Sequence, residues 1–245
     1  MKRTLISVIA ALLPTTLAGA APFEEGDTEM HSYILLDRTG SMSGIWDEAL
    51  TSVNAYAKTV GEEREGESPD TLKTEITLAV FDHQGGLQYD VLRRNTDADA
   101  WNAVTSDEAS PRGMTPLFDA IGRTIAMAEE DNPERAVIVI MTDGHENASQ
   151  EFTRDTARAA LDRARGKGWE VIFLGADFGQ FNDAEGVGMA QSKVMGMSAG
   201  TMQESMQRLA TKARDYGTGN EAEVTFNDED RAIARESDVK GDGGR

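Results

Sequence analysis

Cysteine is absent from the 245 residues of this sequence. Disulfides, thiolate metal sites and cysteine nucleophiles are therefore excluded, and the redox state of the compartment leaves no mark on the chain. No GxGxxG or other phosphate-cradling glycine loop follows an apolar run, and no serine–histidine–aspartate arrangement is present. These absences argue against nucleotide chemistry and against serine hydrolysis.

Positive charge is scarce, because 24 Lys and Arg residues stand against 43 Asp and Glu residues, for a formal net charge of −19. A surface this negative repels phosphate backbones and anionic lipids, so neither nucleic acid nor a membrane surface is an expected partner. The same charge concentrates divalent cations near the protein. Solubility or adaptation to salt is the ordinary explanation of such acidity, so the charge alone does not indicate a metal.

Long apolar runs are also missing, except at the start of the chain. Lys2 and Arg3 precede an apolar segment at 5–13, and the small-residue pattern Ala18-Gly19-Ala20 follows. This order is typical of a secretory signal peptide and is too short to span a bilayer stably. We therefore predict a signal peptide at 1–20 and a secreted or periplasmic mature chain without membrane insertion. A buried amphipathic helix or an uncleaved anchor is the alternative, and without a signal the chain would be cytoplasmic.

Apolar runs of strand length alternate with segments of helical periodicity along the rest of the chain. Strands are expected at 31–36, 76–81, 87–92, 136–141, 169–174 and 193–197, and helices at 46–61, 99–104, 117–132, 153–165, 181–189 and 202–213. The run 136–141 is fully apolar, so it is expected at the centre of the sheet. This alternation predicts an α/β, Rossmann-like, doubly wound fold, with a mostly parallel central sheet flanked by helices and one antiparallel edge strand.

One domain accounts for this pattern, because the sequence shows no internal repeat and no second core. We place this domain at residues 30–216. Residues 217–245 are polar and end in glycines. They predict an acidic C-terminal tail that is partly disordered.

Oxygen-bearing side chains lie at three separate places near expected strand ends. Asp37, Thr39 and Ser41 follow the first strand, Thr115 lies in a loop before a helix, and Asp143 ends the central strand. Because ligands of open parallel sheets sit at the carboxyl ends of strands, these groups are expected to meet there. Hard oxygens without thiolate or imidazole suit Mg²⁺ or Mn²⁺, which leave a position open for an outside ligand. The sequence therefore predicts a metal site able to grip a carboxylate of a partner.

Three motifs give the chain a family resemblance. They are Asp37-Arg38-Thr39-Gly40-Ser41-Met42, Gly113-Met114-Thr115-Pro116-Leu117-Phe118-Asp119-Ala120 and Met141-Thr142-Asp143-Gly144. With this set the chain resembles the von Willebrand factor type A (vWA) domain family, whose metal ion-dependent adhesion site combines an Asp-x-Ser-x-Ser loop with a distant Thr and a distant Asp. The resemblance covers nearly the whole mature chain in element order, and three separate motifs are far more specific than one.

The resemblance implies a role for each matching residue. Ser41, Thr39 and Thr115 would offer hydroxyls to the metal, while Asp37 and Asp143 would act mostly through bound water and hydrogen bonds. It also implies a protein partner that presents an Asp or Glu carboxylate to complete the metal coordination.

Two residues depart from the family pattern. Thr39 stands where Ser is commoner, which keeps the hydroxyl but stiffens χ1. Met114 stands where close relatives often have Gly, so the loop beside Thr115 is expected to differ in flexibility. Neither change removes a donor, so an intact site is expected.

Ordinary structural explanations exist for each candidate taken alone. Asp37 could cap a turn, Thr39 or Ser41 could cap the following helix, and Asp143-Gly144 alone is a turn signal. It is the combination with Thr115 that favours the metal site.

Other polar residues near the strand ends have structural explanations too. Asp177 is expected to be a satisfied loop carboxylate, although it could lie on the same rim. Asp119 is expected to favour the dipole of its own helix. Asn147 begins a glycosylation sequon, Asn147-Ala148-Ser149, and could equally cap the next helix.

Two further function classes remain beside the predicted non-enzymatic, metal-dependent binding. His83 and His145 follow strand ends, so a metal-dependent hydrolase could use one of them as a base, although an exposed loop histidine is the ordinary explanation. A faint likeness to aspartyl-phosphate phosphatases fails because Thr39 stands where that family needs a second Asp. The last class is a structural domain whose metal serves stability only.

Overall fold

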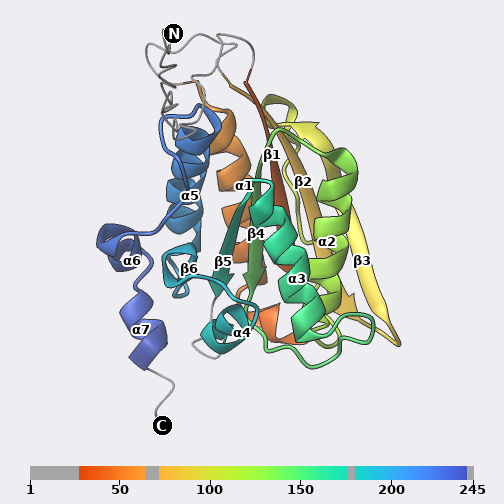
Figure 1. Ribbon diagram of the computed structural model, residues 1–245. Coiled ribbons are helices and arrows are strands. Elements are labelled where there is room, and N and C mark those ends of the chain that lie inside the picture. The colour runs from red at the N-terminus through yellow and green to blue at the C-terminus, as the bar shows by residue number, and fades with distance from the viewer. Residues whose placement is uncertain (1–27, 64–71, 176–179, 242–245) are drawn as a thin grey trace, which may run out of the picture.

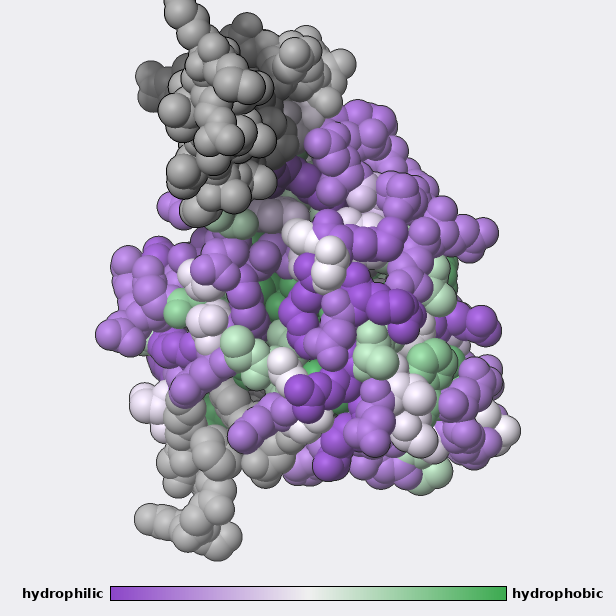
Figure 2. All heavy atoms as spheres, in the orientation of Figure 1, coloured by the Kyte–Doolittle hydropathy of each residue, from purple (hydrophilic) through white to green (hydrophobic). Residues whose placement is uncertain are grey.

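The computed structural model describes residues 28–63, 72–175 and 180–241 (Figure 1). The predicted signal peptide at 1–20 lies outside these residues and stays a prediction, as does the place of Asp177. Among the described helices, none has the length and apolarity needed to cross a bilayer. Hydrophilic residues cover most of the face seen in Figure 2, in keeping with the charge of the chain.

Six strands form one sheet in the order β3-β2-β1-β4-β5-β6. Along this order, the neighbouring strands β2, β1, β4, β5 and β6 pair in parallel. The edge strand β3 pairs with β2 in the antiparallel direction. The strands are β1 Thr28–Asp37, β2 Leu72–His83, β3 Leu87–Asp97, β4 Arg135–Thr142, β5 Glu170–Gly175 and β6 Val194–Gly196. The predicted fold class is confirmed.

Helices cover both faces of this sheet (Figure 1). One face is covered by α1 (Trp46–Gly61) and α5 (Met202–Gly217), and the other by α2 (Leu117–Asp131) and α3 (Arg154–Gly166). The shorter helices are α4 Gln180–Gly186, α6 Asp228–Ile233, α7 Glu236–Gly241 and the 3₁₀ turns η1 Gly40–Gly44, η2 Ala98–Ala100 and η3 Gln191–Lys193.

Helical periodicity decides which side of α1 is buried. Leu50, Val53, Ala57 and Val60 recur every three or four residues and are all buried against the sheet. Burying one large apolar side chain contributes about 1.5–3 kcal/mol, so this stripe holds the helix in place although its other face is polar.

The centre of the sheet positions the predicted site. β4 is buried from Ala136 to Thr142 and lies between β1 and β5. β1 pairs with β2 on one side and with β4 on the other, so the strand order reverses at β1. Open α/β sheets bind ligands at the carboxyl ends of strands beside such a reversal. Asp37 ends β1 and Asp143 follows β4, which places both carboxylates at this point.

The helix predicted at 99–104 is wrong, because a tertiary contact extends most of this segment. η2 ends at Ala100, and Asn54 of α1 holds the residues after it. The Asn54 Oδ1 accepts hydrogen bonds from the Val104 N–H at 2.9 Å and the Trp101 indole N–H at 3.0 Å, and its Nδ2 donates to the Val104 carbonyl at 2.9 Å.

The segment beyond residue 216 contributes side chains to the packing of the domain. Val224 and Phe226 belong to the core on the α1–α5 face. Asp230 of α6 is 1% exposed and pairs with Arg208 of α5, with 2.8 Å between Oδ1 and Nε. Val224, Phe226 and Asp230 therefore pack onto the domain, while partial disorder of the C-terminal tail stays a prediction.

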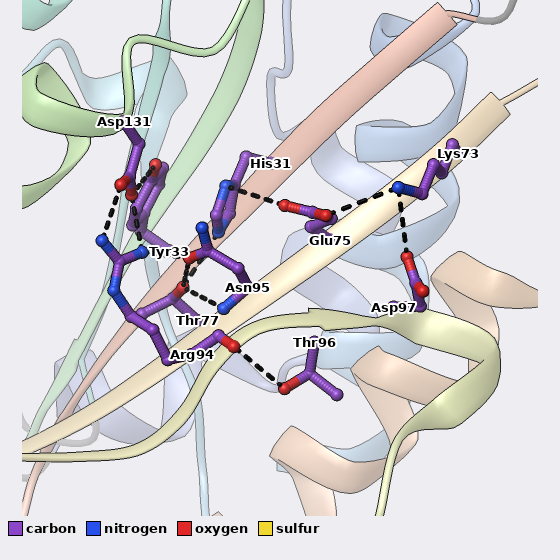
Figure 3. A network of polar contacts seen from close by, with 10 residues as sticks. All are labelled: His31, Tyr33, Lys73, Glu75, Thr77, Arg94, Asn95, Thr96, Asp97 and Asp131. Carbon is purple, nitrogen blue, oxygen red and sulfur yellow. Dashed lines mark hydrogen bonds and ion pairs between the residues drawn. The ribbon is translucent and has the colours of Figure 1, made fainter.

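A network of polar contacts, buried at His31, Tyr33 and Thr77 and exposed at Arg94, ties β1, β2, β3 and α2 together in the half of the sheet away from Asp37 (Figure 3). The Tyr33 hydroxyl donates to Asp131 Oδ2 at 2.8 Å, and Arg94 donates twice to the same carboxylate at 2.6 Å. His31 stacks on Tyr33 and lies 2.9 Å from Thr77 Oγ1. Burial lowers the pKa of His31 to about 4, so the ring is neutral near pH 7.

Candidate metal site

Asp37 is fully buried at the end of β1, with both carboxylate oxygens occupied. Its Oδ1 accepts a hydrogen bond from the Thr39 N–H at 2.7 Å, and its Oδ2 accepts one from the Thr142 hydroxyl at 2.6 Å. The first bond curls the chain after the strand, so the Thr39 and Ser41 side chains lie close together. The second ties the end of β1 to the end of β4.

Ser41 connects the loop after β1 with the loop after β4. Its Oγ lies 3.1 Å from Thr39 Oγ1 and donates to Asp143 Oδ1 at 2.7 Å. Ser41 is exposed, whereas Thr39 is buried. A chain of oxygens therefore runs from the buried end of the site to the surface.

Thr115 comes from a third loop, and Gly144 brings it into the group. A Cβ built on Gly144 would lie 2.8 Å from Thr115 Oγ1 and 3.5 Å from both Asp37 Oδ2 and Ser41 Oγ. These three oxygens therefore lie together beside Gly144, where any side chain would crowd them. We call this oxygen-lined place the Gly144 cradle.

All five residues predicted from the sequence meet at one place: Asp37, Thr39, Ser41, Thr115 and Asp143. Within the described residues, no group of three or more His, Cys, Asp or Glu side chains could hold a metal. The site differs from such a group because three of its five oxygen-bearing side chains are hydroxyls. Hydroxyl and carboxylate oxygens fit a hard dication such as Mg²⁺ or Mn²⁺.

The electrostatics of the site favour a cation. Burial raises the pKa of Asp37 to about 6, the hydrogen bonds from Thr142 and Thr39 oppose that rise, and the charge of Asp143 adds to it. Two carboxylates close together are costly without a positive charge between them when one of them is buried. A bound dication would offset both the burial and the repulsion.

A partly buried ion cluster that no sequence pattern indicated positions the loop before Thr115. Arg38 is 3% exposed and donates to Asp82 Oδ1 at 2.8 Å, and Arg112 donates to Asp82 Oδ2 at 3.2 Å. The Arg112 N–H also donates to the Arg38 carbonyl at 2.8 Å. Gly113 packs so closely on β2 that a Cβ there would lie 2.4 Å from the His83 carbonyl oxygen.

Asp119 has a further role beside the expected one at the start of its helix. It is 2% exposed in the first turn of α2, and it accepts hydrogen bonds from three successive backbone N–H groups, those of residues 150–152, at 2.6–2.9 Å. Asp119 therefore fixes the loop after β4 to the start of α2. Its place at a helix start was the one available sequence signal, and that signal says nothing of a distant loop.

Asn147 and Glu146 complete this anchorage. Asn147 Oδ1 accepts a hydrogen bond from the Thr115 N–H at 2.8 Å, and the Asn147 N–H donates to the Thr115 carbonyl at 3.0 Å. Glu146 Oε2 accepts from the Phe118 N–H at 2.9 Å, which satisfies a free amide at the α2 N-terminus. Asn147 is thus engaged with Thr115 and caps no helix of its own.

The two histidines considered as bases make loop contacts. His145 Nδ1 lies 3.3 Å from Asp183 Oδ2, and the His145 side chain is 59% exposed. His83 Nε2 lies 3.1 Å from the Gln150 side-chain nitrogen.

The sequence profile of the von Willebrand factor type A domain matches residues 33–232. The chain belongs to this family. The match begins within β1, covers the other five strands and all three loops of the site, and extends past residue 216 into α6. No curated protein matches the sequence closely enough to count as a relative.

Solved vWA structures share the fold at low sequence identity. The vWF domain of the type V pili tip protein Mfa5 from Porphyromonas gingivalis has a TM-score of 0.56 and 11% identity, covering 76% of this chain and 95% of that one. The manganese-loaded TRAP protein of Plasmodium vivax has a TM-score of 0.50 and 13% identity, covering 73% and 72%.

Proximal thread matrix protein 1 from the mussel byssus, solved with a zinc-occupied MIDAS motif (metal ion-dependent adhesion site), also has a TM-score of 0.50. It is 18% identical over 80% of this chain. The chain spans about half the length of that protein. At such identities these likenesses establish the fold of the chain and leave its ligand and partner to be argued from its own residues.

Proposed function

We propose that this vWA domain binds a protein partner through a divalent metal, Mg²⁺ or Mn²⁺, held at the Gly144 cradle. The single observation that carries the proposal is the convergence of hydroxyl and carboxylate oxygens from three loops at that place. The metal-loaded vWA structures from Plasmodium vivax and from mussel support it by analogy of fold.

Each residue has a distinct task in this proposal. Ser41, Thr39 and Thr115 offer hydroxyl oxygens, which leave most of the positive charge of the dication uncancelled. Asp143 positions the Ser41 hydroxyl by a hydrogen bond, Asp37 fixes the loop through the Thr39 N–H, and both carboxylates supply negative charge. When bound, the dication supplies a Lewis-acidic position for an outside oxygen. An Asp or Glu carboxylate of the partner suits that position.

We infer that the mature chain is secreted or periplasmic, because the predicted signal peptide precedes the domain. Two fold neighbours, the pili tip protein Mfa5 and the PilB minor pilin from Streptococcus sanguinis, are pilus proteins, which supports an extracellular setting. We also infer that the protein is not an enzyme. A metal-dependent hydrolase would need a base beside the metal, and the hydrogen bonds of His145 and His83 in the described residues run to Asp183 and Gln150 rather than to the five oxygen-bearing residues.

Metal binding and partner capture test the proposal with one pair of variants. Ser41→Ala removes a proposed ligand, whereas Ser43→Ala removes an exposed hydroxyl in the same turn that bonds only locally, to the Gly40 carbonyl. Mn²⁺ binding is measured by the loss of the free Mn²⁺ EPR signal. Proteins from the source cell envelope are then captured in Mg²⁺ and eluted with EDTA.

The proposal expects weakened Mn²⁺ binding and no EDTA-elutable partner for Ser41→Ala, and wild-type behaviour for Ser43→Ala. Capture that persists in EDTA, with Ser41→Ala folded and unaffected, contradicts it. Turnover of phosphoester or peptide substrates with Mn²⁺, abolished in His145→Ala, would favour the hydrolase. A large fall in melting temperature in EDTA without any metal-dependent partner would favour a purely structural metal.

A further inference from the structure

Met114 is the residue immediately before Thr115, and half of its surface is open to solvent. It is 50% exposed, and among the described residues only Val91, at 40%, is another exposed large apolar side chain. Single exposed apolar residues are common on protein surfaces, so exposure alone is not informative. The position of Met114 beside the site is what calls for an explanation.

The backbone around Met114 is held rigidly from three sides. The Gly40 N–H donates to the Gly113 carbonyl at 3.2 Å. Met114 itself exchanges two backbone hydrogen bonds with His83, at 3.0 and 3.4 Å. The Thr115 N–H is bonded to Asn147. The side chain is therefore presented to solvent by a fixed backbone rather than by a loose loop.

We expect a protein partner that reaches the Gly144 cradle to extend over the exposed Met114 next to it in the chain. Consecutive Cα atoms are about 3.8 Å apart, so the backbone of Met114 is the immediate neighbour of the Thr115 backbone. A typical protein–protein interface buries about 800 Å² on each side, which extends well beyond one residue from its centre. The thioether side chain is flexible and polarisable, which suits it to contact apolar groups of irregular shape.

We propose that Met114 sets the specificity of the site, which recognises a carboxylate accompanied by a large apolar side chain one to three residues away. The inference rests on the proposed function, and it adds the chemistry of the partner segment. The carboxylate reaches the metal, and the neighbouring apolar side chain covers Met114. Because the chain carries a net charge of −19, an apolar contact is a way to hold an acidic segment without adding to charge repulsion.

Two sets of capped peptides test this inference on the full chain in Mg²⁺. Each peptide carries one Asp, and either Leu or Ser stands one, two or three residues to either side of it. Binding is followed by NMR of the methionine methyl groups and by fluorescence anisotropy. We expect the best Leu peptide to bind about fivefold more tightly than its Ser counterpart, as covering half of a Met side chain predicts.

Variants separate this contact from other causes of the preference. In Met114→Ser, the Leu and Ser peptides should bind equally tightly. In Met114→Leu, the Leu peptide should still bind more tightly than the Ser peptide. The preference should also persist in Val91→Ser, which removes the other exposed apolar side chain from β3. Because the contact is apolar, raising the salt from about 0.05 to about 0.5 M should not change the preference.

The outcomes distinguish this inference from the proposed function. If Asp peptides bind in Mg²⁺, and EDTA releases them, but the Leu preference is absent or survives in Met114→Ser, the inference is wrong and the metal site stands. If no peptide binds in a metal-dependent way, the proposed function is refuted and the inference is refuted with it.

Discussion

Replacing Gly144 by Ala should abolish tight metal binding while leaving the fold intact. Gly144 does not adopt a left-handed φ, so Ala is conformationally tolerated there. The added Cβ would lie 2.8 Å from Thr115 Oγ1, whereas ordinary contact begins near 3.4 Å. The Thr115 hydroxyl would therefore have to retreat by about 0.6 Å.

Such a shift is large for a metal ligand and small for a protein core. Mg²⁺ demands near-octahedral geometry with oxygens at about 2.0–2.1 Å, and workable sites keep their distances within about 0.2 Å. We expect Mn²⁺ affinity to fall by about 10–100-fold, the usual effect of disturbing groups around a metal. The free energy of unfolding should change by less than about 1 kcal/mol, because Gly→Ala also reduces the entropy of the unfolded chain.

EPR titration of free Mn²⁺ measures the affinity, and urea unfolding in EDTA measures the stability. Titrations at about 0.15 M salt suppress weak binding to the acidic surface. Gly44→Ala is the matched control, since a Cβ there would meet nothing within 4 Å and its φ is not left-handed. A folded Gly144→Ala protein that binds Mn²⁺ as tightly as wild type would refute the reasoning.

Three further predictions concern pH and the loop after β4. In metal-free protein the pKa of Asp37 is raised to about 6 from 3.8, so the folded state binds this proton more tightly than the unfolded chain does. The free energy of unfolding should therefore fall by about 2 kcal/mol from this group as pH rises from 4 to 6, and Asp37→Asn should remove that slope. His31 acts with the opposite sign, because its pKa is lowered to about 4 from 6.5. Its contribution is complete above pH 6.5 and is lost as pH falls towards 4, by about 3 kcal/mol, and His31→Phe should remove this loss. Urea unfolding in EDTA between pH 4 and 7 tests both, and parallel pH curves for wild type and variant would contradict either. Asp119→Asn sets an amide donor against a backbone N–H, so it should lower the free energy of unfolding by about 1–3 kcal/mol and weaken Mn²⁺ binding. The exposed first-turn acid of α3 supplies the control, Asp155→Asn, and equal effects of the two changes would disprove the anchoring role.

The sequence predicted the sheet and the meeting of the five oxygens because both follow from local patterns. Fully apolar runs such as 136–141 indicate central strands, and parallel strands bring their carboxyl ends to one edge. Asp37 and Asp143 could therefore be placed together from strand patterns alone, although they are far apart in the chain. Whether the group holds a metal stays a prediction.

Contacts between distant segments could not be predicted in the same way. Asn54 extends the chain at Trp101 and Val104, yet nothing in the periodicity of α1 marks it as a tether. Asp119 likewise satisfies three amides of a loop about thirty residues away. Composition could not predict that Val224 and Phe226, which lie in a polar segment with few apolar residues, join the core.

The direction of β1 decides at which end of the sheet the protein is best attached to a surface or to another domain. This strand runs from Thr28 to Asp37, a length of about 30 Å, so the chain enters at one end of the sheet and the Gly144 cradle lies at the other (Figure 1). A bead, a sensor chip or a fused domain joined directly at Thr28 would lie at the end of the sheet opposite the proposed metal site. Immobilisation through the N-terminal side should therefore leave the whole oxygen-lined edge open to a partner arriving from solution.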